Sequence, residues 1–210
     1  MKKLDDLKKQ YEKLGKEIEK LEKQKSKLKL YDVIEWCGYE WYIINLKDNE
    51  TTLFMKDKLP SSDVEQYFSE RLLDSCKDVK FDTKGKNPWW ADSEIRFTLN
   101  SLFLDELDVE QMNKMTTTVG LDGQERTTED YVRLITKEET ELLPQEILKC
   151  SGEYGYWTMS PSSFRYWFNA HELSVNSTGE VSPNNTWNGY GVRPVINLNT
   201  DVNELIKLKK

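Results

Sequence analysis

The first thirty residues carry apolar side chains at alternating steps of three and four, interrupted only by Lys25, a spacing that restricts the segment to a helix with one narrow apolar stripe. Such a stripe is typical of a coiled coil rather than of a helix that packs on a broad core. We therefore predict that residues 1–30 make the protein a homo-oligomer; the alternative is a helix folded back on its own domain. The predicted seam consists of Leu4, Leu7, Tyr11, Leu14, Ile18, Leu21 and Leu28.

The charges beside this seam do not favour a parallel arrangement. In a parallel dimer Glu17 would face Glu22 and Lys3 would face Lys8, and both like-charged pairs are unfavourable. Antiparallel pairing and pairing with a helix of another protein both stay open.

Charge is distributed unevenly along the chain. Residues 1–30 hold 11 Lys and 6 Asp or Glu, a net charge of +5, while the rest holds 19 Lys or Arg and 31 Asp or Glu, a net charge of −12. Because an acidic body repels phosphate backbones, we do not expect nucleic-acid binding. The same charge would attract a basic protein partner or a protein groove that normally holds nucleic acid.

Cysteine usage and hydropathy indicate where the protein is made. Cys37, Cys76 and Cys150 lack metal-like spacing, and their odd number favours a reducing compartment. The sequence has no apolar run of membrane-spanning length and no signal-peptide pattern at its start. We therefore expect cytoplasmic synthesis without a signal peptide and no membrane contact; association with a virion stays open.

Beyond residue 30 the composition changes to aromatic and β-branched residues, which predicts one α+β domain over residues 31–210. Helices are expected where a capping residue precedes apolar residues at helical spacing, and strands where β-formers lie between turn signals. The expected strands are 31–45, 51–55, 131–135, 156–159, 171–175 and 192–198, the expected helices are 61–76, 93–103, 108–115 and 137–142, and 116–128 is expected to form a loop or hairpin.

Several motifs follow one another in a fixed order: Tyr39-Glu40-Trp41; Trp90, Ser93, Arg96, Leu99-Asn100 and Phe103-Leu104; Thr127 to Ile135; Gly155 to Pro161; and Gly191 to Ile196. Together they resemble a bacterial and phage domain of unknown function. The resemblance covers about residues 31–199 and leaves the N-terminal helix outside.

That family is similar to the C-type-lectin-like fold of formylglycine-generating-enzyme-like proteins and of the variable proteins of diversity-generating retroelements. The resemblance implies an α+β domain with a small twisted antiparallel sheet. It also implies that the irregular segment before the last strand forms an exposed, ligand-facing surface. Thr158-Met159 departs from the family pattern, which commonly has an Arg before Ser-Pro at this point.

The segment from 162 to 190 combines aromatic residues with Asn and Ser, a mixture that favours recognition because rigid rings supply contact area and small polar side chains adapt their hydrogen bonds. The alternative is that the domain buries these rings and uses Asn and Gly for turns. Trp157 and Phe168 favour the core, whereas Trp187 and Tyr190, flanked by Asn and Gly, favour the surface. The candidate ligand-binding residues are Arg165, Tyr166, Trp167, Asn169, His171, Asn184, Asn185, Trp187, Asn188 and Tyr190.

A second set of residues is expected to be structural. Adjacent indoles in a polar loop usually close the base of a helix, and an Arg can stack on one of them. Arg193 lies between β-formers and is expected to hold a loop carboxylate or carbonyl. The set consists of Trp89, Trp90, Arg96, Trp157 and Arg193.

Residues for catalysis are scarce. His171 is the only histidine, so the chain offers neither a histidine-rich metal site nor alternative bases for a Ser-His-Asp triad. Formylglycine-generating enzymes use a pair of cysteines late in the domain, where this chain has only Cys150. We predict no catalytic residue, no metal and no cofactor, and fold similarity alone does not make the protein an enzyme.

These observations favour a non-enzymatic binding module, encoded by a phage or prophage and displayed as an oligomer through its coiled coil, with a protein or cell-surface ligand. The alternative is an intracellular phage inhibitor of a host defence complex that acts through its acidic surface. An enzyme is the third hypothesis and has only fold analogy behind it.

Overall fold

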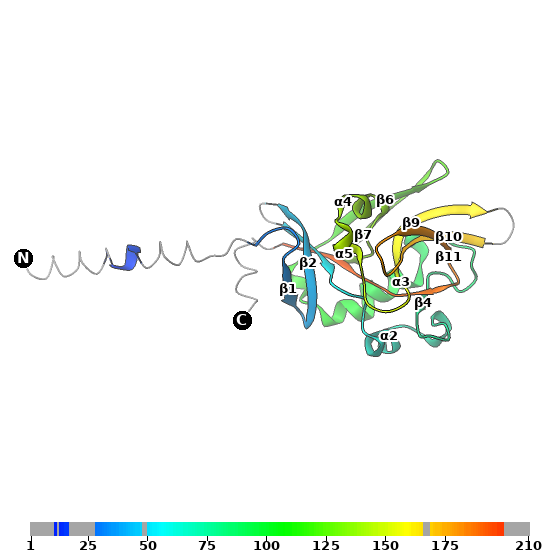
Figure 1. The fold of residues 1–210 in the computed structure, drawn as a ribbon, viewed down its shortest axis with the longest axis horizontal. Coiled ribbons are helices and arrows are strands. Elements are labelled where there is room, and N and C mark those ends of the chain that lie inside the picture. The colour runs from blue at the N-terminus through cyan, green and yellow to red at the C-terminus, as the bar shows by residue number, and fades with distance from the viewer. Residues whose placement is uncertain (1–10, 12, 17–27, 48–49, 166–168, 200–210) are drawn as a thin grey trace, which may run out of the picture.

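The computed structural model describes residues 11, 13–16, 28–47, 50–165 and 169–199, with residues 163–165 and 169 described by their backbone alone. It has the mixed α+β architecture that the sequence predicts, with short helices and mostly antiparallel strands (Figure 1). No helix in the described part of the chain is long and apolar enough to cross a membrane.

The main sheet has the strand order β1 (Val33–Trp36), β2 (Tyr39–Lys47), β3 (Glu50–Met55), β13 (Val195–Leu198) and β5 (Met112–Asn113), and β8 (Val132–Arg133) also pairs with β13. The single strand predicted over 31–45 is wrong, because Cys37 and Gly38 both have positive φ and turn the chain between β1 and β2. The last strand, β13, lies inside the sheet, with β3 on one side and β5 and β8 on the other.

The helices agree in part with the expectation. Helix α2 (Ser61–Tyr67) is shorter than the predicted 61–76 because Phe68 and Ser69 are extended, and it follows Pro60 without a side-chain cap. Helix α3 (Glu94–Thr98) begins after Ser93, whose hydroxyl accepts from the Arg96 amide, and continues as a π-helix over Leu99–Phe103, which confirms the prediction for 93–103. A 3-10 turn lies at Leu104–Glu106, another at Glu70–Leu72 and a third at Trp90–Asp92.

The helix predicted over 108–115 is wrong. Only Val109–Gln111 forms a 3-10 turn, after which the chain enters β5 and then β6 (Met115–Leu121). Strand β6 forms a hairpin with β7 (Gln124–Asp130) through Asp122 and Gly123, whose φ angles of 52° and 78° are those of a type I′ turn. Helical spacing in a short Met- and Val-containing segment does not outweigh pairing with a neighbouring strand.

The C-terminal half contains the predicted helix and a second sheet. Helix α4 (Lys137–Leu142) has a capping box between Thr136 and Glu139, which confirms the prediction for 137–142, and α5 (Gln145–Leu148) follows. Strands β9 (Tyr156–Arg165), β10 (Asn169–Val175) and β11 (Val181–Asn185) form a three-stranded sheet, and β12 (Gly189–Tyr190) pairs with β4 (Val79–Lys80).

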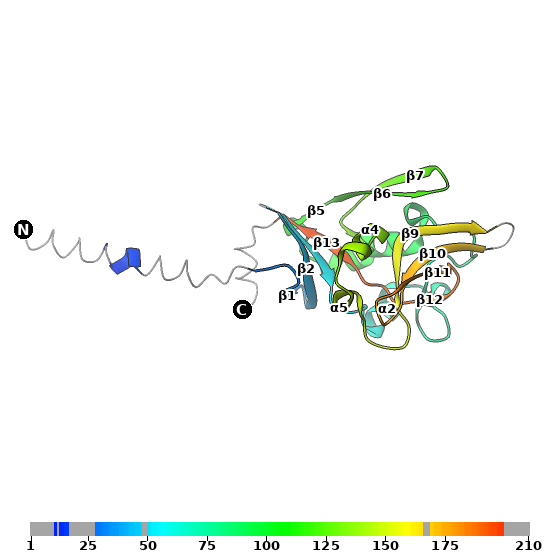
Figure 2. The same cartoon turned by 45° about the horizontal axis from the view of Figure 1, so that its top comes forward.

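The two projecting hairpins lie at one end of the domain. Figures 1 and 2 show β6–β7 and β9–β10 extending from the same end, whereas β1, where the chain enters the domain, lies at the opposite end. The domain begins before residue 31, because Leu28 is 6% exposed and belongs to the main hydrophobic core.

Candidate ligand-binding surface

The structure divides the ten predicted ligand-binding residues into groups. Tyr166 and Trp167 lie outside the described residues, and Arg165 and Asn169 are the facing ends of β9 and β10. His171 lies on β10, opposite Asn185 on β11. Asn184 lies on β11, Trp187 and Asn188 lie in the turn that leads from β11 to β12, and Tyr190 lies on β12.

Trp187 is the exposed aromatic residue of this turn, with 43% of its surface accessible. Its ring packs against Gly85, where a Cβ atom would lie 2.6 Å from Cε3 of the indole, and Gly85 has a φ of +64° that also favours glycine. The backbone of Gly85 therefore supports one side of an indole that is open to solvent elsewhere. Such an arrangement holds a large rigid ring in place at the surface.

The loop beneath Trp187 is fixed by hydrogen bonds at both ends. The Asp82 carboxylate accepts from the amides of Lys86 and Asn87, and the Asp82 amide donates to the carbonyl of Thr186. The Gly85 carbonyl accepts from the amide of Ala170 on β10. The loop is thus joined to the end of the three-stranded sheet.

Two lysines flank the supporting glycine. Lys84 and Lys86 are exposed, and neither ammonium group has an ion-pair or hydrogen-bond partner in the described part of the chain. Sequence reasoning missed this loop because it lies about a hundred residues before Trp187. The sequence Lys84-Gly85-Lys86 after an Asp was the available signal, since it indicates a tight turn with two cations.

His171 and Asn185 face each other across β10 and β11, and both carry a buried atom without a hydrogen-bond partner, Nδ1 of the imidazole and Oδ1 of the amide. Buried polar atoms are normally paired, and each exception calls for an explanation. The amide of Asn188 donates to the carbonyl of Asn185, so this pair lies at the base of the turn that carries Trp187. Two buried polar atoms without partners therefore lie at the base of the turn that carries the exposed indole.

The opposite face of the same strands carries a second unpaired set. Glu172 is fully buried, neither carboxyl oxygen has a partner, and the hydroxyl of Thr186, directly after β11, is also unpaired. Burial raises the pKa of the Glu172 carboxyl well above its usual range, which favours its protonated form. Five of the eight unpaired buried side-chain atoms among the described residues belong to 171–172 and 185–186.

Two predicted ligand-binding residues have structural contacts instead. The Asn184 amide donates to the hydroxyls of Ser174 and Ser182. Tyr190 is half-buried, and its ring centroid lies 4.7 Å from that of Trp157, so the expectation that Tyr190 faces the surface holds only in part.

The residues predicted to be structural are buried or held by partners. The Trp90 indole and the Arg96 guanidinium both donate to Asp130, at 2.9 and 2.8 Å, which joins the start of α3 to the end of β7. The Arg that stacks on the adjacent indole is Arg126 rather than Arg96, with its guanidinium carbon 4.7 Å from the Trp89 ring centroid. Trp157 is fully buried and donates to the Val79 carbonyl.

Arg193 is fully buried and is held by main-chain carbonyls rather than by a carboxylate. Its guanidinium donates to the carbonyls of Met55 and Lys56 at the end of β3 and to those of Ile147, Leu148 and Lys149 at the end of α5. The residue of the Gly-Val-Arg-Pro motif therefore joins two loops to the closing strand.

The seam residues are described only in part. Tyr11 and Leu14 lie on a helical segment and are 77% and 59% exposed, so their apolar side chains are uncovered within one chain. The prediction that Leu28 belongs to the coiled-coil seam is wrong, because its side chain is buried in the core of the domain. Leu4, Leu7, Ile18 and Leu21 lie outside the described residues.

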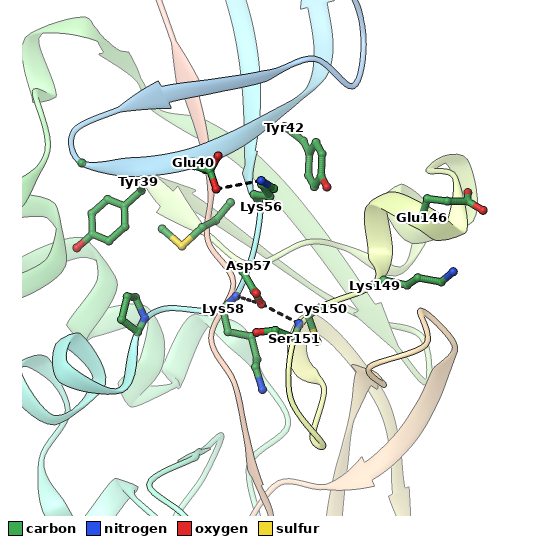
Figure 3. Close-up of a pocket in the computed structure, with 13 residues that line it drawn as sticks. Tyr39, Glu40, Tyr42, Lys56, Asp57, Lys58, Glu146, Lys149, Cys150 and Ser151 are labelled. Atoms are coloured by element: carbon green, nitrogen blue, oxygen red, sulfur yellow. Dashed lines mark hydrogen bonds and ion pairs between the residues drawn. The ribbon is translucent and has the colours of Figure 1, made fainter. Parts of the chain in front are cut away.

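A cavity of about 550 Å³ lies at the side of the main sheet, between β2, the end of β3 and α5 (Figure 3). In its wall Lys56 pairs with Glu40, the Asp57 carboxylate accepts from the amides of Lys58 and Ser151, and the Lys58 ammonium donates to the Tyr154 carbonyl. Burial raises the pKa of the Cys150 thiol in its wall, which makes this thiol a weak nucleophile. The cavity is lined by side chains of both charges, whereas the loop beside Trp187 carries two lysines.

In the described part of the chain, no group of three or more His, Cys, Asp and Glu side chains is arranged to hold a metal ion. Comparisons with family models, curated proteins and solved structures found no match to this chain.

Proposed function

We propose that the protein is a non-enzymatic binding module that recognises an anionic polysaccharide through the Trp187 surface, defined as Trp187, Gly85, Lys84, Lys86 and the His171–Asn185 pair. The observation that carries the proposal is the exposed indole held on Gly85 between two unpaired lysines. The rest of the domain is acidic, so two cations on either side of one glycine form a local site of positive charge.

The chemistry of the surface supports this ligand class. The face of a sugar ring is apolar and can stack on an indole, as other flat groups do. The two lysines attract carboxylate or phosphate groups. His171 and Asn185, each with a buried unpaired atom, lie on the strands to which this loop is joined. A neutral polysaccharide would use only the indole.

A binding role fits the surroundings of the single histidine better than catalysis does. Nδ1 of His171 has no hydrogen-bond partner, whereas a catalytic imidazole is normally oriented by one. Its cross-strand partners are Asn185 on β11 and Ser163 on β9.

The proposal includes display of several copies on one coiled coil. The exposed side chains of Tyr11 and Leu14 support self-association of the N-terminal helix, and the hairpins lie at the end of the domain opposite β1, where the chain enters it (Figure 1). Several weak sites on one oligomer would bind a repetitive polymer by avidity. The C-type-lectin-like fold and the phage or prophage origin belong to this proposal and are supported by the ordered motifs of the sequence.

The direct test is retention on immobilised polysaccharides, with polygalacturonate as the anionic probe and dextran as the neutral one. We expect the full-length protein to bind polygalacturonate, and Trp187→Ala and the double variant Lys84→Gln/Lys86→Gln to lose at least about tenfold in affinity. Lys77→Gln, an exposed lysine elsewhere, is the matched control and should bind normally. Equal retention of all four proteins, or no retention of the wild type, would contradict the proposal.

A second candidate function is inhibition of a host defence complex through the acidic surface. It is favoured by a run of exposed carboxylates after α3, formed by Asp105, Glu106, Asp108 and Glu110. Binding to a basic groove would weaken as salt is raised, so complex formation with host proteins that persists unchanged at high salt would exclude it.

A further inference from the structure

In the β6–β7 hairpin, the edge of β6 that faces away from β7 has main-chain groups that form no hydrogen bonds within the hairpin. In a hairpin with a two-residue turn, the residues beside the turn form a hydrogen-bonded pair, and the pairs then alternate. Leu121 and Gln124 flank the turn, so the amides and carbonyls of Gly120, Thr118 and Thr116 point away from β7. Among the described residues, these three make no backbone hydrogen bond to another element.

This free edge lies along a cleft. A cavity of about 280 Å³ is lined on one side by residues 118–122 of β6 and its turn and on the other by Ser160, Pro161 and Ser162 of β9. Figures 1 and 2 show the two hairpins projecting side by side from the same end of the domain. Strand β9 already pairs with β10 on its other side, so an edge of each sheet borders the cleft.

Unpaired negative charge surrounds the cleft. Asp122 and Glu138 line it, and Glu125 and Glu129 lie on β7 opposite Gly120 and Thr116. In the described part of the chain none of these four carboxylates has a hydrogen-bond or ion-pair partner. The two nearby cations are occupied, because Lys137 pairs with Glu141 and Arg126 pairs with Asp92.

We propose that this cleft binds an extended, basic segment of a partner protein, which adds to β6 as a further strand. The main-chain groups of Thr116, Thr118 and Gly120 supply the hydrogen bonds, and the four carboxylates select Lys or Arg side chains on the added strand. The inference assigns a second surface, for a polypeptide, and does not depend on the polysaccharide surface at Trp187.

The test uses a fluorescent, end-blocked peptide of alternating threonine or valine and lysine, TKVKTKV, titrated with the full-length protein and followed by anisotropy. Its glutamate counterpart TEVETEV tests charge selection. The lysine peptide with alternate amides N-methylated tests main-chain pairing without changing the protein. We expect both altered peptides to bind at least about tenfold more weakly than TKVKTKV.

Two proline variants give a matched comparison on the protein. Thr118 and Thr127 are cross-strand partners whose hydroxyl oxygens lie 2.7 Å apart, and their amides point to opposite outer edges of the hairpin. Thr118→Pro removes a donor facing the cleft and should reduce peptide affinity about tenfold, whereas Thr127→Pro removes one from the far edge and should leave it unchanged. Trp187→Ala should also leave it unchanged, which separates this surface from the polysaccharide surface. Equal binding of the three peptides, no binding of TKVKTKV, or equal effects of the two prolines would overturn the inference.

Discussion

The guanidinium carbon of Arg193 lies 3.9 Å from the centroid of the Phe54 ring, inside the protein and without a carboxylate bonded to it. Tyr156 lies on the same cation at 5.0 Å, and five carbonyls accept its hydrogen bonds. The buried guanidinium thus contacts two aromatic rings and donates to carbonyls at the ends of β3 and α5. Arg193 is therefore a structural tie between β3, α5 and the closing strand.

Replacing Arg193 should strongly destabilise the fold. We expect Arg193→Met to lower the free energy of unfolding by about 3–5 kcal/mol, because the variant leaves buried carbonyls without donors. Arg193→Lys should also destabilise, since an ammonium group cannot reach carbonyls in both loops as the planar fork does. Urea unfolding followed by circular dichroism measures the effect.

Arg71→Met is the control for that experiment. Arg71 pairs with Glu94 at 2.7 Å on the surface, where such pairs contribute at most about 1 kcal/mol. A loss for Arg193→Met no larger than that for Arg71→Met would contradict the structural role.

Glu172 should make stability fall as pH rises. Its raised pKa means that the native state keeps a proton at pH values where the unfolded chain, with an ordinary pKa near about 4.3, has released it. The native state therefore binds more protons, and its stability decreases from about pH 4.3 upward toward the folded pKa. Unfolding free energies measured between about pH 5 and 8 should decline less steeply for Glu172→Gln than for the wild type; parallel profiles would show that the carboxyl is not held neutral.

The capping box of α4 gives a smaller prediction. Thr136 accepts from the amide of Glu139, and the Glu139 carboxylate accepts from the amide of Thr136 and from Arg133. Thr136→Ala should cost about 1 kcal/mol of unfolding free energy, and Thr136→Ser should keep most of it. An alanine variant as stable as the serine variant would show that the cap contributes little.

Local signals predicted the elements that depend on local interactions. Ser93 and Thr136 are cap residues whose effect is confined to one helical turn, and the Asp122-Gly123 pair encodes its own turn. Sequence reasoning failed where distant contacts decide. Met112 and Asn113 pair with β13, which comes about eighty residues later, and Leu28 packs in a core assembled from the rest of the domain.

The candidate surface shows the same division. The spacing of Asn and aromatic residues indicated Trp187 and Asn185, but the support from Gly85 and the two lysines depends on a contact between segments about a hundred residues apart. The unpaired state of His171 and Asn185 is a property of strand register, which the sequence does not display.

The oligomer prediction needs a truncation placed by the structure. Because Leu28 belongs to the core, a variant beginning at residue 31 would damage the domain, whereas one beginning at Leu28 removes the helix and keeps the core. We expect light scattering to give a multiple of the chain mass for the full-length protein and the monomer mass for the truncated one. A full-length monomer would contradict self-association.

The most direct test of the central claim is the affinity of Gly85→Ala for polygalacturonate. The substitution keeps Trp187 and both lysines but places a Cβ atom where the indole now packs, so the ring must move. We predict at least about tenfold weaker binding than wild type, with Gly123→Ala, another positive-φ glycine with open space around it, as the control for backbone strain. Binding of Gly85→Ala that equals the control would show that the position of Trp187 does not matter and would contradict the account.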